Sequence, residues 1–198
     1  MKTRFFVASI FIAMGSVSAF AQPAAGTTQR DVNQQTRIEN GLKDGQLTTA
    51  EAGRLEKQQS RIDRLQAKDL KDGKLTPNER AQLTHAQNKA SRDIKVADTN
   101  AAKGNPDSKS SERMQADVQR NVNQQTRIAQ GVKSGTLTGQ ETGRLERGQA
   151  RVDHKEGVAA HNGHLGAREQ VVVQRSENRQ SKRIFNKKHN AAMAPSAS

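Results

Sequence analysis

Residues 40–56 read NGLKDGQLTTAEAGRLE, and this stretch holds the end of one helix and the start of the next. Gly45 can adopt the left-handed conformation that commonly ends a helix. Thr48 and Glu51 have the spacing of a capping box, in which a hydroxyl and a carboxylate satisfy the first free N–H groups of a helix. The stretch therefore predicts two helices joined by a tight turn.

The same turn recurs along the chain. The segment DGQLTTAEAGRL at 44–55 returns as DGKLTPNERAQL at 72–83. Further copies of the capping pair are Thr76 with Glu79 and Thr138 with Glu141. Between the turns, helix-favouring residues dominate and apolar residues recur at three- and four-residue steps. The pattern predicts an all-α fold, with helices at 29–43, 48–71, 76–97, 119–133, 138–160 and 166–188.

The chain contains an internal duplication. RDVNQQTRIENGLKDGQL begins at Arg30, and RNVNQQTRIAQGVKSGTL begins at Arg120, 90 residues later. A repeat at fixed spacing indicates repeated structural units, so we expect two tandem units of about three antiparallel helices each. The expected divisions are a first unit at 29–98, a flexible Pro/Gly/Ser-rich linker at 99–118, a second unit at 119–190 and a disordered tail at 191–198.

The first 21 residues have the pattern of a secretory signal peptide. Lys2 and Arg4 supply a charged start, an apolar stretch follows, and a small-x-small cleavage site ends at Ala21. No later segment approaches the ~20 apolar residues that a membrane helix needs. We therefore expect an exported, periplasmic protein, cleaved near Ala21, without a transmembrane segment.

The composition argues against catalysis. The chain carries a formal net charge of +13 and has no Cys, Trp or Tyr, which excludes disulfides and thiolate metal sites. The sequence has no glycine-rich phosphate loop and no local Ser–His–Asp arrangement for nucleophilic attack. We expect a protein that is not an enzyme and that has no certain cofactor, calcium being the one candidate.

The turns resemble degenerate EF-hand loops. The pattern D-G-x-L-x-x-x-E matches the back half of such a loop, where a glycine turns the chain and a later glutamate binds calcium through two oxygens. The resemblance implies weak calcium binding, although Leu42 stands where the family has a ligand in the window 40–51. The implied ligands are Asn40, Asp44 and Glu51 in that window and Asp72, Glu79 and Glu141 in the others. Helix capping alone explains the same residues, and both interpretations stay open.

Three histidines of the second unit, His154, His161 and His164, are a second candidate for metal binding. Imidazole groups suit zinc, copper or nickel. Their spacing matches no standard ligand pattern, and the first unit has basic residues at the corresponding positions. Solvated surface histidines are the alternative interpretation.

The last predicted helix carries a basic stripe. Its members are Arg175, Arg179, Lys182, Arg183, Lys187 and Lys188. Such a stripe attracts polyanions. Nucleic acid is not expected, because the protein is predicted to be exported and offers no aromatic platform on which bases stack. Anionic envelope polymers or lipid headgroups are the expected partners, and a solvated charged face without a partner is the alternative.

The L-T-x-x-E helix starts, the export signal, the basic charge and the lack of cysteine give the chain a class-level similarity to helical chaperones of the Spy/CpxP type. That family has L-T-x-x-Q at its helix starts, and the tandem arrangement here also differs. The resemblance implies holding of unfolded proteins in the periplasm. We therefore expect a non-enzymatic binding protein with a basic surface, with weak calcium binding and chaperone activity as alternatives.

Overall fold

The computed structural model describes residues 21–190, which form six α-helices and no strand, so the predicted all-α fold is confirmed. The helices are α1 (Ala21–Lys43), α2 (Thr49–Asp69), α3 (Pro77–Thr99), α4 (Lys109–Lys133), α5 (Gly139–Ala159) and α6 (Ala167–Lys188), with a 3-10 turn η1 (Leu70–Asp72) after α2. None of these helices is long and apolar enough to cross a membrane. The predicted signal sequence, apart from Ala21, and the predicted tail at 191–198 lie outside the described residues.

The turns between helices form as predicted. Gly45, Gly73, Gly135 and Gly163 all have positive φ angles, of 66°, 91°, 72° and 80°. At the starts of α2, α3 and α5, a Thr hydroxyl accepts the N–H of the Glu three residues on, and that Glu carboxylate accepts the N–H of the Thr. Gly166 has no hydroxyl, so α6 keeps only half of the capping box, the 2.8 Å bond from the Gly166 N–H to Glu169.

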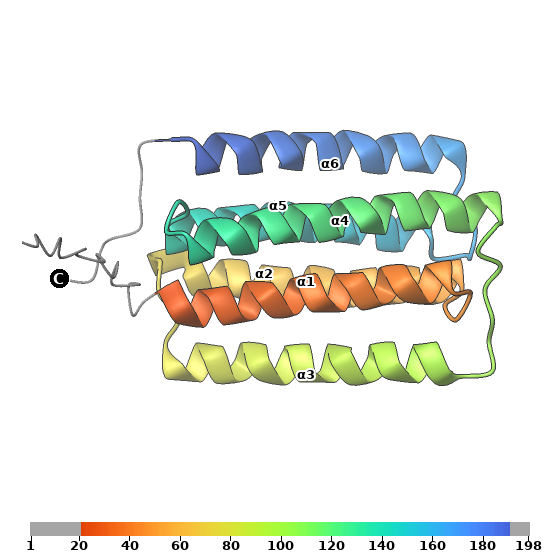
Figure 1. The fold of residues 1–198 in the computed structure, drawn as a ribbon, viewed down its shortest axis with the longest axis horizontal. Helices are drawn as coiled ribbons and strands as arrows, with labels where there is room; N and C mark the ends of the chain where they lie inside the picture. The colour runs from red at the N-terminus through yellow and green to blue at the C-terminus, as the bar shows by residue number, and fades with distance from the viewer. Residues whose placement is uncertain (1–20, 191–198) are drawn as a thin grey trace, which may run out of the picture.

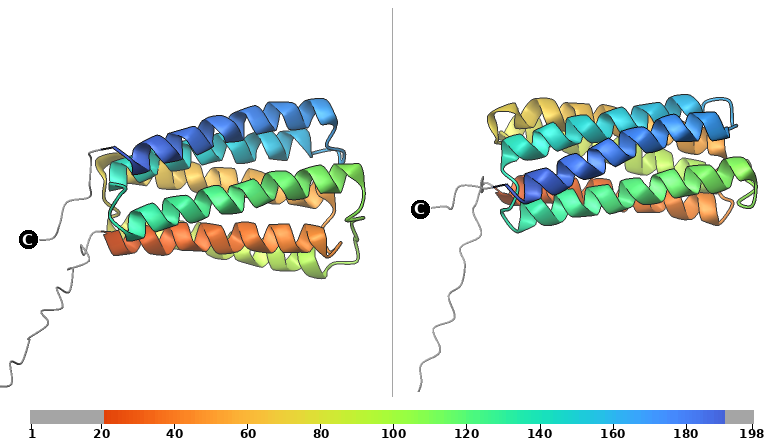
Figure 2. Two further views of the ribbon diagram at one scale, coloured as in Figure 1. Left: turned by 45° about the horizontal axis from the view of Figure 1, so that its top comes forward. Right: turned by 90° about the horizontal axis from the view of Figure 1, so that it is seen from above.

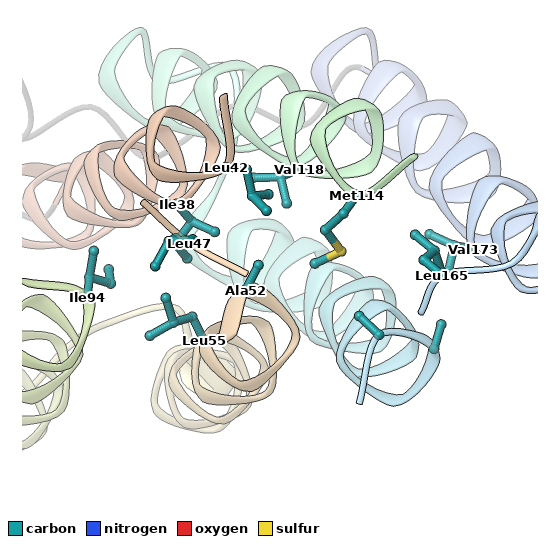
Figure 3. Packing of buried hydrophobic residues seen from close by; sticks show 12 residues of the cluster. Ile38, Leu42, Leu47, Ala52, Leu55, Ile94, Met114, Val118, Leu165 and Val173 are labelled. Carbon is teal, nitrogen blue, oxygen red and sulfur yellow. The ribbon is translucent and has the colours of Figure 1, made fainter. Parts of the chain in front are cut away.

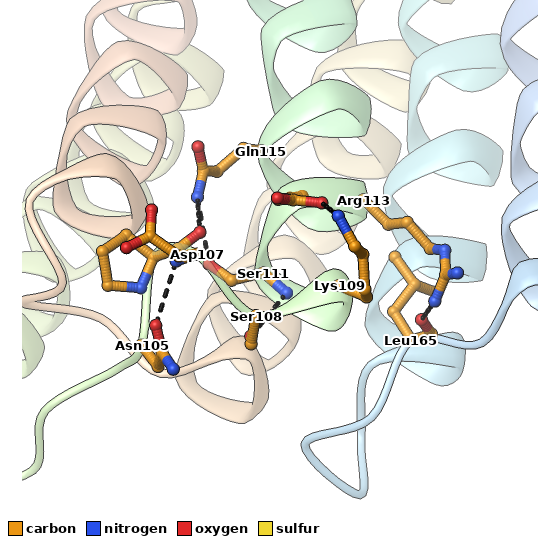
Figure 4. Close-up of polar contacts among 10 residues, drawn as sticks. Asn105, Asp107, Ser108, Lys109, Ser111, Arg113, Gln115 and Leu165 are labelled. Carbon is orange, nitrogen blue, oxygen red and sulfur yellow. Dashed lines mark hydrogen bonds and ion pairs between the residues drawn. The ribbon is translucent and has the colours of Figure 1, made fainter.

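Two helix starts differ from the prediction. Helix α1 begins at Ala21 rather than 29, and Ala24 is buried against an apolar cluster. Helix α4 begins at Lys109 rather than 119, so half of the predicted linker is helical. The Ser108 hydroxyl caps α4 by accepting the Ser111 N–H at 3.1 Å (Figure 4). The early turns of α4 are then held by Met114, which is fully buried.

The helices are arranged in four layers (Figure 1). Helices α1, α2, α4 and α5 form a central bundle in which α1 contacts α4 and α2 contacts α5, so the two repeats pack directly on each other. Helix α3 covers the outer face of the α1–α2 pair, and α6 covers the α4–α5 pair (Figure 2). Each half therefore has three helices in two layers, and each helix runs antiparallel to the next one along the chain. The α1–α2 layer of the first half meets the α4–α5 layer of the second in the middle.

The apolar core is divided between the two ends of the bundle. One cluster includes Ile38, Leu47, Ile94, Met114 and Leu165, which come from both repeats (Figure 3). A second cluster lies at the other end and contains Ala24, Leu70, Ile128, Val132, Leu137, Leu145 and Ile184. Between the two clusters, the buried side chains of the central helices are largely Gln, Asp and Glu. A bundle interior with this much polar content is unusual, because buried polar groups require partners.

Candidate functional site

The acidic residues of the turns are engaged as helix caps. One oxygen of Glu51 accepts the N–H and hydroxyl of Thr48 at 3.0 and 2.7 Å, and the other accepts the Asn100 amide at 2.6 Å. Partial burial opposes ionisation of Glu51, but these hydrogen bonds outweigh it and lower its pKa. Glu141 repeats the arrangement with Thr138 and Asn190, and its pKa is also lowered.

The remaining predicted calcium ligands have local roles as well. Glu79 accepts the N–H and hydroxyl of Thr76, both at 2.8 Å, and Asp72 accepts the Lys74 N–H at 3.0 Å. Asn40 accepts the Asp44 N–H through its backbone carbonyl at 2.8 Å. Within residues 21–190, the groups of three carboxylates close enough to share an ion lie in the core rather than at these turns. Calcium binding by the turns stays a prediction.

The three predicted histidines lie in two different parts of the structure. His161 and His164 are exposed at the α5–α6 turn, where His161 Nδ1 lies 2.7 Å from the Val158 carbonyl oxygen. His154 lies on α5 and lines two surface hollows that are described below. No group of three close metal-ligand atoms in the described part of the chain includes a histidine. Their predicted metal binding stays a prediction.

A hollow lined by cationic side chains lies between α5 and α6, and we call it the basic cleft. Its volume is about 240 Å³, and it has no acidic lining residue. Its lining residues are Arg64 of α2, Gly148, Arg151, His154 and Lys155 of α5, and Ser176, Arg179 and Arg183 of α6. Clustered positive charge along a hollow concentrates the field and attracts anions.

The basic cleft unites part of the predicted basic stripe with residues that the stripe did not include. Arg179 and Arg183 line it, whereas Arg175, Lys182 and Lys188 do not. Lys187 instead pairs with Glu141 at 3.4 Å. Lys155 donates to the Ser176 hydroxyl at 3.2 Å, which orients its ammonium group beside α6. The guanidinium groups of Arg64 and Arg151 come from α2 and α5, so only the packing of these helices with α6 brings them to the basic cleft.

The corresponding surface of the first repeat is neutralised. Arg179 corresponds to Lys89, and Arg183 corresponds to Asp93. Asp93 pairs with Lys89 at 2.6 Å and accepts the Gln58 amide at 2.7 Å. The bond from Lys89 is the main cause of the lowered pKa of Asp93, which is therefore ionised and offsets the local positive charge. At these two positions the first repeat therefore has an internal ion pair, whereas the second has two arginines that line the basic cleft.

An apolar hollow adjoins the basic cleft, and we call it the valine groove. It has a volume of about 310 Å³ and is lined by His154, Lys155, Val158, Ala159, Glu169, Val172 and Val173. Val158 and Val172 are 49% and 51% exposed. The first repeat has Lys68 and Gln82 at these two positions, so it has no such groove. His154 and Lys155 line both hollows, so the two lie side by side.

The core contains two groups of buried carboxylates that we did not expect from the sequence. The first carboxylate cluster is Asp31 of α1, Asp63 of α2 and Glu146 of α5, and the second is Glu56 of α2 with Asp153 and Glu156 of α5. Within each cluster, one oxygen of each residue lies within 4.8 Å of the others. The available signal was the repeat itself, because Glu56 and Asp63 recur as Glu146 and Asp153 on one helix face.

Burial controls the ionisation of these groups. Desolvation raises the pKa of Asp31 to about 8 and that of Asp153 to about 7. Burial also raises the pKa of Asp63 and Glu146 well above the usual range, and the neighbouring carboxylates add repulsion. Removing a carboxylate from water penalises its charged form, so each group must take a proton, a hydrogen bond or a cation.

Known proteins give no further indication of the role of this chain. Comparisons with protein-family models, with curated proteins and with solved structures find no match. The candidate sites of the described residues are therefore the basic cleft with its valine groove on the surface and the carboxylate clusters in the core.

Proposed function

We propose that this chain is an exported, non-enzymatic binding protein for an anionic amphiphile of the cell envelope, a lipid with a phosphate-bearing headgroup. The headgroup would occupy the basic cleft and an acyl chain would lie along the valine groove. The observation that carries the proposal is that the two hollows adjoin, since His154 and Lys155 line both. Export rests on the predicted signal sequence at 1–21.

The chemistry of the basic cleft suits phosphate. Arg64, Arg151, Arg179 and Arg183 line it, and none of them has an acidic partner among the described ion pairs. A guanidinium group binds phosphate oxygens through two parallel hydrogen bonds and stays charged at every physiological pH. Arginines on three different helices can approach one phosphate from several sides.

The valine groove supports an amphiphile rather than a fully soluble anion. Exposed valines beside a charged site leave apolar area in water, and covering them with an acyl chain is favourable by about 25 cal/mol per Å². A sugar phosphate or a polyphosphate would leave this surface uncovered. A headgroup with an attached hydrocarbon chain matches both hollows.

The duplication fits this proposal. We infer that the tandem units at 29–98 and 119–190 have diverged: the second unit carries most of the ligand site, and the first contributes Arg64 of α2 to it. The neutral Lys89–Asp93 pair and the polar residues Lys68 and Gln82 stand in the first unit where the second has cations and valines.

Vesicle flotation tests the proposal. The chain from Gln22 onward is mixed with phosphatidylcholine vesicles with or without phosphatidylglycerol, and the floated fraction is measured. The variant R179E/R183E reverses two cleft charges, and K71E/K95E makes the same change in net charge on exposed residues of the first unit. We expect the first variant to lose binding to anionic vesicles and the second to retain most of it.

Two results would count against the proposal. Equal loss in both variants would mean that net charge alone attracts the protein to the vesicles. Equal binding to neutral and anionic vesicles would mean that the arginines are not used. Suppression of aggregation of an unfolded protein, with no vesicle binding, would instead favour the chaperone function.

A further inference from the structure

The two carboxylate clusters occupy equivalent positions in the repeats, but their amide partners differ. The matched pairs are Asp31 with Asn121, Asp63 with Asp153, Glu146 with Glu56, and Gln66 with Glu156. Each set therefore contains three carboxylates and one amide, placed by the same helices of the duplicated fold. In the first set the amide is Gln66, whereas in the second it is Asn121, which corresponds to Asp31.

The second cluster has its own hydrogen-bond donors. The Asn121 amide donates to Glu156 at 2.6 Å, and the Gln149 amide donates to Asp153 at 3.0 Å. The Gln149 amide also donates to the Asn121 oxygen at 2.9 Å. Side-chain N–H groups thus satisfy some of the carboxylate oxygens of the second cluster.

The first cluster also has donors, since the Gln87 amide donates to Asp31 at 2.7 Å and the Gln125 amide donates to Glu146 at 3.1 Å, but the amide of the set itself is unpaired. Gln66 is fully buried, and neither atom of its amide has a hydrogen-bond partner. Its amide lies close enough to Asp31 to lower the pKa of that carboxyl, but without hydrogen-bond geometry. One oxygen each of Asp31, Asp63 and Glu146 is also buried and unpartnered. The same holds for one oxygen each of Glu56, Asp153 and Glu156, so the difference between the clusters is the buried, unpaired Gln66 amide beside Asp31.

No positive side chain offsets this cluster by direct contact. The ion pairs of the described residues involve none of its members, and the one cation that acts on Asp31 is the neighbouring Arg30. Buried acidic groups without a cationic partner are costly unless protonated or bound to a metal. A proton on a neighbouring carboxyl group would satisfy the Gln66 oxygen only if it pointed at that oxygen. A metal ion bound by the oxygens of all four side chains would satisfy each of them.

We propose that the first carboxylate cluster binds one hard divalent cation, held by oxygens of Asp31, Asp63, Glu146 and Gln66. Opposite oxygens around Ca²⁺ lie about 4.6–5.2 Å apart, twice the usual calcium–oxygen distance. The spacing of up to 4.8 Å within this cluster matches that size. Carboxylate and amide oxygens select calcium, manganese or magnesium over the softer metals that prefer nitrogen or sulfur.

Burial determines how the ion must enter. All four ligand residues are nearly inaccessible to solvent, so an ion cannot exchange through an open path. Binding is therefore coupled to folding, and the ion is acquired as α2 packs against α5. This site is independent of the basic cleft and differs from the EF-hand-like turns, whose glutamates are used as caps.

The repeats supply a matched pair of variants for the test. D31N gives the first cluster the amide that the second repeat has at that position, and E156Q gives the second cluster the amide of the first. The protein is unfolded with a chelator and refolded with calcium, manganese or magnesium. Bound metal is then counted by mass spectrometry after desalting, and thermal unfolding is followed by circular dichroism.

We expect one ion per chain in the unmodified protein and in E156Q, none in D31N, and a melting temperature that the ion raises by about 3–8 °C only where it is bound. E146Q, which removes a different ligand, should also lose the ion if D31N fails to fold. An unmodified protein that refolds without retaining any of the three ions would overturn the proposal. Loss of the ion in E156Q but not in D31N would overturn it as well.

Discussion

Asp63 and Asp153 stand at the same position of the two repeats and lie close enough across the interface between α2 and α5 for each to shift the pKa of the other. Ser60 and Ala150 form a second such pair, since the Ser60 hydroxyl donates to the Ala150 carbonyl at 2.7 Å. Contacts between equivalent residues are the mark of an approximate two-fold relation. The duplicated halves thus meet face to face, and the polar side of each helix layer becomes interior.

The close approach of α2 and α5 depends on glycine. A Cβ at Gly157 would lie 2.6 Å from the Gly53 carbonyl oxygen, whereas a Cβ at Gly26 would meet nothing within 4 Å. We expect G157A to lower the free energy of unfolding by about 1–3 kcal/mol through overpacking. G26A should raise it by about 0.5–1 kcal/mol, because alanine favours a helix over glycine. Urea denaturation measures both, and equal effects would contradict this packing.

The stability of the protein should fall as the pH rises from about 5 to 8 in the presence of a chelator. Burial, with added repulsion from Glu177, raises the pKa of Asp117 to about 8, and burial raises that of Glu177 to about 7 despite its bond from Arg120. The folded state then holds more protons than the unfolded state, so deprotonation favours unfolding. Denaturant midpoints across this pH range measure the slope.

The substitution D117N separates this effect from other acidic groups. It should raise the free energy of unfolding at pH 8 by about 1–3 kcal/mol, because it removes a buried charge whose oxygens have no hydrogen-bond partner. At pH 4 the Asp117 carboxyl is already neutral in the folded state, and the variant should match the unmodified protein. A gain of the same size at both pH values would show that charge is not the cause.

The substitution R183D introduces into the basic cleft the acid that the first repeat has in Asp93. The new carboxylate should pair with Arg179, as Asp93 pairs with Lys89, and weaken binding to anionic vesicles by about tenfold or more. The reciprocal D93R should not weaken it. Unchanged binding in R183D would place the anionic ligand elsewhere.

Loss of one valine should distinguish the valine groove from the basic cleft. V172S keeps every cleft charge and removes apolar contact, so lipid binding should fall by about 5–20-fold while binding of inorganic phosphate stays unchanged. Isothermal titration calorimetry with a short-chain phospholipid and with phosphate compares the two. Equal weakening of both would mean that the substitution disturbs α6 as a whole.

Local rules accounted for the helices and turns of the described chain. The four left-handed glycines and the three complete capping boxes depend on residues within one turn, which is why the sequence pattern predicted them correctly. The predicted starts of α1 and α4 were wrong, because they were placed where the internal repeat begins. Buried residues before the repeat, Ala24 and Met114, extend both helices.

The sites depended on packing that sequence periodicity does not reveal. Arg179 and Arg183 were predicted because they share one helix face, whereas Arg64 and Arg151 reach the basic cleft only through the packing of α2, α5 and α6. The core carboxylates were missed because charged residues at a helical period usually face water. Here the face that carries Asp63 packs against its own repeat copy.

Nuclear magnetic resonance tests the central claim most directly, because it locates the ligand. The chain from Gln22 onward, labelled with ¹⁵N, is titrated with a water-soluble short-chain phosphatidic acid. We predict shifts of the arginine Nε–Hε signals of Arg64, Arg151, Arg179 and Arg183, with backbone shifts at Val158 and Val172. Shifts spread over basic residues that do not line the basic cleft, or an absence of shifts at Arg179 and Arg183, would contradict a specific site between α5 and α6.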